Sequence, residues 1–270
     1  MKSYTQFERR KHILDELEKY NRVMVNDLAK VLNVTTETIR RDLDMLHKEG
    51  QLTKIHGGAI KKKDQTLEFH FNKRRAENIE EKRKIAMEAS KLVEDNDIIA
   101  IEIGTTTMQI LDYIHDKKNL TILTNSIPAV NKIIELKEQY DSFDCRLIVI
   151  GGILNTNSLA LSGEMTLNYL DHFTVNKLFA SCDGISLEKE LTCSYIEDAQ
   201  IYKQLKHNAK QVVMMVDESK FNLTKFYKSG NFSDIDALYT NAKLDEAWQN
   251  VLTSNGVEVH AHQLKNLDYP

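Results

Sequence analysis

The chain has 270 residues, 41% of them hydrophobic and 28% charged, which is typical of a globular protein large enough for two domains. No apolar run approaches 18 residues and no apolar signal segment follows Met1, so the sequence predicts a cytoplasmic protein that neither spans nor binds a membrane. Residues 1–63 carry 14 Lys/Arg and 9 Asp/Glu (net +5), whereas residues 64–270 carry 22 and 31 (net −9), so a polyanion is the expected partner of the first part.

Three short helices are predicted within the first 50 residues. Apolar residues at helical spacing predict the first helix over Phe7–Tyr20 and the second over Val25–Leu32. A turn follows, and Thr35 or Thr36 can cap the third helix, whose apolar stripe ends at Gly50.

A β-hairpin is predicted next. The alternation after Leu52 surrounds the pair Gly57-Gly58, which indicates two short strands joined by a glycine turn, as in the wing of a winged helix. Residues 61–65 lack apolar side chains and suit the start of a linker, and the pattern from Phe71 to Leu92 predicts a further helix.

From about Asp97 onward, short apolar runs alternate with helical stretches, which predicts a mostly parallel α/β sheet covered on both faces. The expected strands are residues 98–103, 120–123, 146–150, 177–180, 211–216 and 237–240, with 257–259 as an edge strand. Ligands of such sheets bind at the carboxyl ends of the strands.

The third helix has the features of a DNA recognition helix. Arg40 and Arg41 lie near its N-terminus and away from its apolar stripe, where cations reach base edges and phosphates in the major groove. Ion pairs with Asp42 or Asp44 are the alternative for these arginines. The expected DNA contacts in this region are Thr35, Thr36, Thr38, Arg40 and Arg41, with helix capping the alternative for the threonines.

The residues from Val25 to Ala59 resemble the signature of the DeoR family of transcriptional regulators. The resemblance rests on Val25-Asn26-Asp27-Leu28-Ala29, on Leu32-Asn33-Val34-Thr35-Thr36-Glu37-Thr38-Ile39-Arg40-Arg41-Asp42-Leu43, and on His56-Gly57-Gly58-Ala59. The family has serine more often than threonine at the position of Thr35, a change that keeps the capping hydroxyl. The resemblance implies that His56, Gly57 and Gly58 belong to a wing that contacts DNA, with packing within the wing as the alternative for His56.

Polar turns follow five of the predicted strands, and the first of them suits an anion. Gly104-Thr105-Thr106-Thr107 precedes a helical stretch over 108–114, and unpaired N–H groups and hydroxyls at a helix N-terminus favour a phosphate, although capping alone is the alternative. Lys220 can supply a counter-charge. The expected effector-binding residues are Gly104, Thr105, Thr106, Thr107, Asn125, Ser126, Gly151, Gly152, Asp183, Gly184, Lys203 and Lys220.

These turns resemble those of the DeoR-family C-terminal sensor, which is similar in fold to ribose-5-phosphate isomerase and CoA-transferase-like domains. The resemblance implies that a phosphorylated sugar binds there and alters operator affinity, usually relieving repression. The sequence departs from the family at Glu102, where aspartate is usual, at Ser186, where a second aspartate is common, and at Tyr202, beside which only Lys203 remains of a lysine-rich pair. The resemblance therefore does not identify the effector.

Three sequence parts are predicted: a winged helix-turn-helix domain over 1–62, a linker and connecting helix over 63–95, and an α/β sugar-phosphate sensor over 96–270. We expect a repressor of a carbohydrate-metabolism operon that binds double-stranded operator DNA as a homodimer or homotetramer. It needs no cofactor and no metal, because the three cysteines lack metal-ligand spacing and His260 and His262 suit the surface.

Two alternatives remain open. In the first, the C-terminal domain of the DNA-binding protein only forms oligomers. In the second, the chain is a sugar-phosphate isomerase that uses Asp183, Glu197, Asp198 or Lys220 as acid and base. The serine at position 186, where that motif would have a second acid, disfavours the isomerase.

Overall fold

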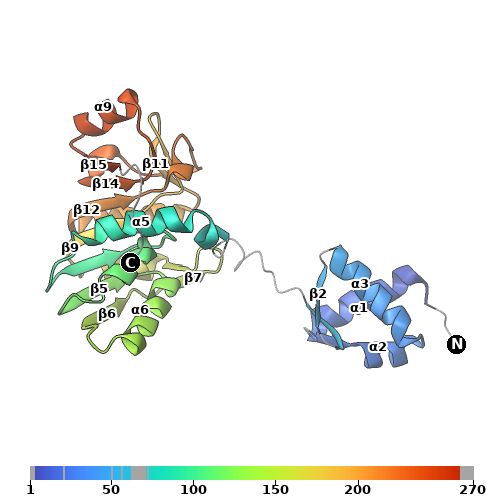
Figure 1. Ribbon diagram of the computed structural model, residues 1–270. Coiled ribbons are helices and arrows are strands. Elements are labelled where there is room, and N and C mark those ends of the chain that lie inside the picture. Colours follow the sequence, from blue (N-terminus) through green and yellow to red (C-terminus); the bar gives the residue numbers. More distant parts are fainter. Residues whose placement is uncertain are drawn as a thin grey trace. The chain divides into compact units, whose positions relative to one another are not determined.

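The computed structural model describes residues 4–20, 22–49, 51–55, 57–61, 71 and 73–261. The chain divides into two compact units, Met1–Thr66 and Leu67–Pro270 (Figure 1).

The first unit has the helices and the hairpin expected from the sequence, together with one strand that was not predicted. Its elements are α1 (Gln6–Tyr20), β1 (Arg22–Met24), α2 (Val25–Leu32), α3 (Thr36–Lys48), β2 (Leu52–Ile55) and β3 (Gly58–Lys61). The strands form an antiparallel sheet in the order β1-β3-β2. Ile13, Leu32 and Leu43, one from each helix, are buried in its core.

The start of α3 is fixed by two local features. Asn33 adopts the left-handed conformation (φ 51°) and ends α2, which this residue type tolerates better than most. Thr35 then caps α3, because its hydroxyl accepts a hydrogen bond from the amide of Thr38. Thr35 is therefore the N-cap, and Thr36 is the first residue of the helix.

Two glycines shape the hairpin. Gly57 has a φ of +80° at the turn, and a Cβ atom on Gly58 would lie 2.1 Å from the carbonyl oxygen of Val23 in β1. Only a glycine lets β1 pair this closely with β3.

The second unit is built on a sheet of seven parallel strands in the order β15-β14-β12-β9-β4-β5-β6. The strands are β4 (Ile98–Ile101), β5 (Leu120–Thr124), β6 (Cys145–Val149), β9 (Val175–Ala180), β12 (Ala209–Met215), β14 (Ala237–Thr240) and β15 (Glu258–Ala261). All six predicted strands are present, and β15 is the expected edge strand. The second unit also has two small antiparallel sheets. One pairs β7 (Ile153–Asn155) with β8 (Ala160–Ser162), and the other joins β10 (Gly184–Ser186), β11 (Glu190–Cys193) and β13 (Tyr227–Gly230).

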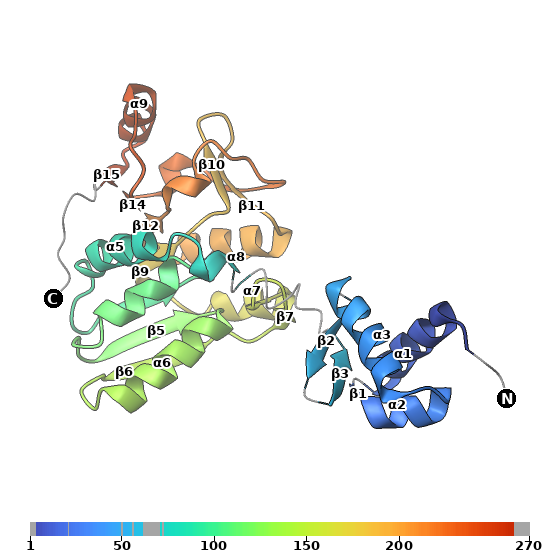
Figure 2. The same cartoon turned by 45° about the vertical axis from the view of Figure 1, so that its right-hand side comes forward.

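Helices cover both faces of the large sheet, as the continuous apolar strands predicted. The helical elements are α5 (Ile79–Ser90), η1 (Thr107–Tyr113), α6 (Ile127–Gln139), α7 (Glu164–Leu170), α8 (Ile196–His207), η2 (Glu218–Lys220), η3 (Phe232–Asp234) and α9 (Glu246–Ser254) (Figure 2). Side chains of α5, η1 and α6 share one core with Val213 and Met215 of β12, whereas those of α7, α8 and α9 share the other with Met214. Alternate residues of one strand thus pack on opposite faces.

The structure differs from the sequence prediction at two helices. The expected single helix from Phe71 to Leu92 is broken: residues 73–76 are helical, Asn78 is left-handed (φ 53°), and α5 begins at Ile79. Helix α5 packs within the second unit rather than standing apart from it. The helix expected over 108–114 is a 3-10 helix, η1.

Two further findings concern the cysteines and membrane-spanning helices. The three cysteines are free and buried. Within the described ranges, no helix has the length and apolar character needed to cross a membrane. The three-part division of the chain given above stays a prediction.

Replacing Gly58 with alanine tests the packing of the wing. The added methyl group would force β1 and β3 apart, so the variant is expected to lose roughly 2–4 kcal/mol of stability in the first unit. Thermal unfolding followed by circular dichroism measures this loss. Gly151→Ala is the control, because nothing lies within 4 Å of the Cβ atom that it adds; equal melting of the two variants would contradict the prediction.

Candidate DNA-binding surface and ligand-binding cavity

Helix α3 presents two exposed arginines. The side chain of Arg40 is 61% exposed and that of Arg41 79% exposed, and each lies near Glu37, at 3.8 and 3.6 Å. Exposed ion pairs of this kind contribute about 0–1 kcal/mol, so both guanidinium groups are available to a stronger anion.

The expected alternative for these arginines, pairing with Asp42 or Asp44, is not what the structure shows. Asp42 is buried and accepts hydrogen bonds from Arg9 at 2.8 Å and Arg10 at 3.4 Å. Asp44 pairs instead with Lys54 of β2, and this contact lowers the pKa of the Asp44 carboxyl. Helix α3 is thus held to α1 and to the wing by its acids, which leaves its arginines exposed.

The other residues expected to contact DNA lie at the start of α3 and in the wing. Thr35 and Thr38 share a hydroxyl contact of 2.9 Å at the start of α3, where Thr36 is partly exposed. Gly57 and Gly58 form the backbone of the wing, and the carbonyl of Gly57 accepts a hydrogen bond from Val25. His56 lies outside the described residues. DNA contact by these residues stays a prediction.

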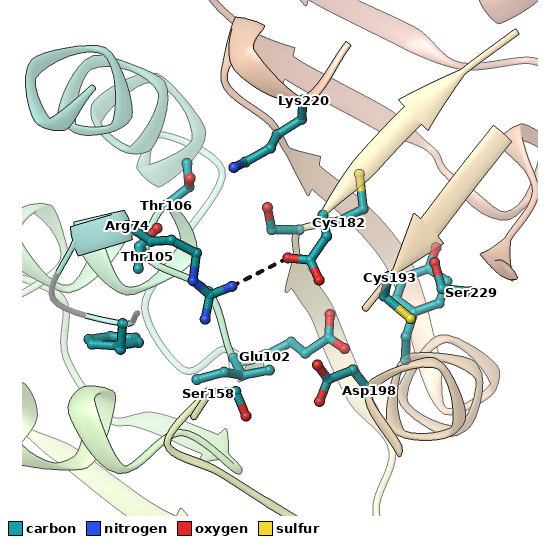
Figure 3. Close-up of a pocket in the computed structure, with 16 residues that line it drawn as sticks. Arg74, Glu102, Thr105, Thr106, Ser158, Cys182, Cys193, Asp198, Lys220 and Ser229 are labelled. Atoms are coloured by element: carbon teal, nitrogen blue, oxygen red, sulfur yellow. Dashed lines mark hydrogen bonds and ion pairs between the residues drawn. The ribbon is translucent and has the colours of Figure 1, made fainter. Parts of the chain in front are cut away.

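The second unit has a polar cavity at the carboxyl ends of β4, β9 and β12. Residues that follow these three strands line it, together with the segment that precedes α5 and the first half of α8. The lining residues are Phe71, Arg74, Glu102, Ile103, Gly104, Thr105, Thr106, Ser158, Ser181, Cys182, Asp183, Cys193, Asp198, Tyr202, Lys220 and Ser229 (Figure 3).

One end of the cavity carries positive charge and hydroxyl groups. Figure 3 shows Lys220 and Arg74 facing the same space as Thr105 and Thr106. Arg74 lies 3.3 Å from the carboxylate of Asp183. This end suits an anion with several acceptor oxygens, because both cations and both hydroxyls can donate to it.

The other end carries two carboxyl groups that point toward each other, those of Glu102 and Asp198 (Figure 3). Burial raises the pKa of Glu102 well above its ordinary value, and the charges of Asp198 and Asp183 raise it further. Burial, and then repulsion by Asp183, raises the pKa of Asp198 to about 7, although Arg74 opposes this. Both shifts favour the protonated form, in which a carboxyl group can donate a hydrogen bond as well as accept one.

Several buried polar atoms of the cavity have no partner within the described chain. They are Arg74 Nε, Glu102 Oε2, Ser158 Oγ and the Tyr202 hydroxyl. A buried polar atom without a hydrogen bond costs about 1–3 kcal/mol, so four in one cavity indicate that it is built to bind a polar molecule.

Comparison with known proteins identifies the family. The DeoR-like helix-turn-helix domain matches residues 9–65, and the DeoR C terminal sensor domain matches residues 77–242. The chain belongs to the DeoR family of transcriptional regulators. It is therefore a DNA-binding regulator of transcription rather than an enzyme.

Two relatives match this DeoR-family regulator over almost its whole length. It is 32% identical over 251 residues to the HTH-type transcriptional regulator IolR of Bacillus subtilis (strain 168), and the alignment covers 92% of this chain and 97% of that protein. It is 27% identical over 254 residues to the glycerol-3-phosphate regulon repressor of Escherichia coli (strain K12), covering 94% and 98%.

Among solved structures, ribose 5-phosphate isomerase A from Methanocaldococcus jannaschii resembles the DeoR-family chain distantly. The TM-score is 0.38 and the identity 21%, over 53% of this chain and 55% of that one. A likeness this low says nothing about function.

The structure brings together only part of the expected effector site of the DeoR-family sensor. Gly104, Thr105, Thr106, Asp183 and Lys220 line the cavity. Among the described residues, the cavity lining does not include Thr107, Asn125, Ser126, Gly151, Gly152, Gly184 or Lys203. Ligand contact by any of these residues stays a prediction.

Most of the expected effector residues that lie outside the cavity lining have structural roles. The hydroxyl of Thr107 donates to the carbonyls of Glu102 and Gly104, and Asn125 bonds the backbones of Ile103 and Leu161. Ser126 caps α6. Side chains would not fit at Gly152 or Gly184, where a Cβ atom would approach Thr166 Oγ1 to 2.0 Å and the Leu223 carbonyl oxygen to 2.6 Å. Gly151 and Lys203 are exposed.

The expected effector-binding residues did not include Arg74, Ser158, Asp198 or Tyr202, although Asp198 was a candidate acid or base in the isomerase alternative and Tyr202 was a departure from the family pattern. Neither Arg74 nor Ser158 belongs to a polar turn directly after one of the predicted strands. Asp198 and Tyr202 lie one turn apart on α8, and this i, i+4 spacing was a signal that one face of the helix serves the cavity. The departure at Ser186 concerns a residue that lies outside the cavity lining and bonds Thr224.

Replacing Asp198 with asparagine tests the acidic end. Because the pKa of Asp198 is raised on folding, the wild-type protein has the full benefit of the protonated group below about pH 4 and loses it as the pH rises through 7. The asparagine variant, which stays neutral, is expected to be more stable than wild type at pH 7.5, by up to about 4 kcal/mol at about 1.4 kcal/mol per pKa unit.

Calorimetric melting between pH 4.5 and 8 measures the difference between wild type and variant. Glu197→Gln is the matched control, because Glu197 is an adjacent acid on the same helix that does not line the cavity. Parallel pH profiles for wild type and Asp198→Asn would contradict the prediction.

Proposed function

We propose that this DeoR-family regulator is a repressor of a carbohydrate-metabolism operon, and that a phosphorylated sugar in the cavity of the second unit controls its operator affinity. The observation that carries the proposal is the division of the cavity into a cationic end and an acidic end around four unpartnered buried polar atoms. A phosphorylated polyol has the complementary division, with an anion at one end and hydroxyl groups along the rest.

The phosphate is assigned to the cationic end. Arg74 and Lys220 supply positive charge, Thr105 and Thr106 supply hydroxyl donors, and a phosphate would compete with Asp183 for Arg74. The helix dipole of residues 108–114 contributes less to phosphate binding than the sequence predicted, because η1 is a short 3-10 helix.

The sugar hydroxyls are assigned to the acidic end. Glu102 and Asp198 can each accept a hydrogen bond, or donate one when protonated, and Ser158 and Tyr202 have free hydroxyls there. Hydroxyl groups both donate and accept, so they satisfy such a mixed set better than a second phosphate would. The cavity also favours a sensor over a domain that only forms oligomers.

The operator is assigned to the first unit. Helix α3 would lie in the major groove with Arg40 and Arg41 near base edges and phosphates, and the wing at Gly57 would lie beside it. Because one recognition helix makes few base contacts, we propose a homodimer or homotetramer that reads repeated half-sites in the cytoplasm.

The DNA-binding proposal predicts that Arg40→Ala and Arg41→Ala each weaken operator binding by about tenfold or more. Each lost phosphate contact should also flatten the salt dependence by about one unit of slope. Fluorescence anisotropy with DNA from the region upstream of the gene, titrated with salt, measures both.

Lys210→Ala is the control for these arginine variants, because it removes the same charge from an exposed site in the second unit. Wild-type affinity and salt dependence in both arginine variants would exclude α3 as the DNA-contacting helix.

The sensing proposal predicts that one member of a sugar-phosphate panel weakens operator binding, and that Lys220→Ala lowers its affinity by about tenfold or more. Lys203→Ala is the matched control, because Lys203 is exposed and outside the cavity lining. Isothermal titration calorimetry with ribose 5-phosphate, glucose 6-phosphate and glycerol 3-phosphate measures the affinities. If the affinity for the sugar phosphate is unchanged in Lys220→Ala but falls in Lys203→Ala, the assignment of the phosphate to the cationic end is wrong.

A further inference from the structure

The two cations of the cavity come from segments far apart in the sequence, and a buried polar junction joins these segments. Arg74 precedes α5, whereas Lys220 ends η2 after β12. The junction consists of Asn78, Lys82 and Asp217, which are outside the cavity lining. Lys82 is 2% exposed and Asp217 is 1% exposed.

Lys82 holds the segment that carries Arg74. Its ammonium group donates hydrogen bonds to the carbonyl oxygens of Arg74 and, at 2.7 Å, of Glu77. These carbonyls lie where the short helix over residues 73–76 ends, so the lysine satisfies acceptors that the helix leaves free. Burial lowers the pKa of Lys82 to about 8, although the charge of Asp217 opposes this.

Asp217 holds the segment that carries Lys220 and binds the first segment to it. One carboxylate oxygen caps η2 by accepting from Ser219, and the same oxygen accepts from the side chain of Asn78 at 3.1 Å. Burial raises the pKa of Asp217, but the bonds from Ser219 and Asn78 and the charges of Lys220 and Lys82 outweigh it and leave the pKa below its ordinary value. The carboxylate therefore stays charged beside the buried ammonium.

A buried ammonium and a buried carboxylate are costly ways to hold two segments together, since apolar residues of similar volume often serve stability as well or better. What the charges add is direction: Lys82 fixes the carbonyls of Arg74 and Glu77. Asp217 fixes the amide of Ser219 and accepts the hydrogen bond of the Asn78 side chain, which links the two segments. The first of these segments also follows the boundary between the two units at Thr66 and Leu67.

We propose that Lys82, Asn78 and Asp217 are positioning residues that set Arg74 and Lys220 for one anion and transmit its binding to the chain arriving from the DNA-binding unit. The inference rests on the proposed function. An anion between the two cations would compete with Asp183 for Arg74, and Lys82 ties the backbone carbonyls of Arg74 and Glu77 to the junction.

The test uses the full chain, with inorganic phosphate as the probe and the same upstream DNA as for the arginine variants. The variants are Lys82→Met and Asn78→Gly, the second of which removes the amide and keeps the left-handed backbone at this position. Lys84→Met, on the same helix and outside the cavity lining, is the control. Phosphate affinity, operator affinity with and without phosphate, and amide hydrogen exchange are measured.

Both junction variants are expected to bind the operator as wild type does when phosphate is absent, and to bind phosphate about tenfold more weakly. Phosphate at concentrations that saturate each variant should no longer change its operator affinity. The amides of Glu77 and Lys220, which bond the carbonyls of Lys73 and Asp217, should exchange faster, whereas those of the α5 interior should not. A merely stabilising role would accelerate exchange throughout the unit.

The inference is overturned if both variants bind phosphate with wild-type affinity and release the operator as wild type does. If the wild-type protein binds phosphate but its operator affinity ignores both phosphate and the sugar phosphates, the sensing function and the transmission fail together. In that case the phosphate affinities of the variants still decide whether the junction positions the two cations.

Discussion

The parallel pairing of β4, β9 and β12 is the constraint on which the ligand-binding unit depends. Ile101 pairs with Phe179, and Ala180 pairs with Met214, so the three strands end side by side. Parallel strands present their carboxyl ends at one edge; the turns after them therefore meet although they lie far apart in the sequence. This edge is where the backbone stops pairing within the sheet and where polar side chains converge around a cavity.

Polar groups at that edge differ from those of an ordinary loop because they are buried. Glu102 and Tyr202 are each 3% exposed, and Glu102 Oε2 and the Tyr202 hydroxyl have no partner in the described part of the chain. Such atoms oppose folding, and a protein retains them where a ligand can satisfy them. The same reasoning applies at the junction of Lys82 and Asp217, where burial makes each hydrogen bond directional and each charge dependent on its neighbours.

The DNA-binding unit follows a different plan, in which the charged groups that hold the fold and those that face outward are separated. Asp42 takes Arg9 and Arg10 into the interface of α1 with α3, and Asp44 ties α3 to the wing through Lys54. Arg40 and Arg41 keep only a weak contact with Glu37. The helix is thus fixed by buried and interfacial pairs, while its outer face remains free for a nucleic acid.

The sequence by itself determined the elements whose signal is local: the helices of the first unit, the Thr35 cap, the glycine wing, and the six apolar strands. It also determined the family, because a long motif with fixed spacing is local information. The tertiary structure decided which polar turns meet. Asn125 and Ser126 follow a strand as Thr105 does, yet their side chains bond the backbone, whereas Arg74 and Asp198 reach the cavity from helical segments. Register, helix packing and the break at Asn78 set these distances, and none of them is encoded in the spacing of a single segment.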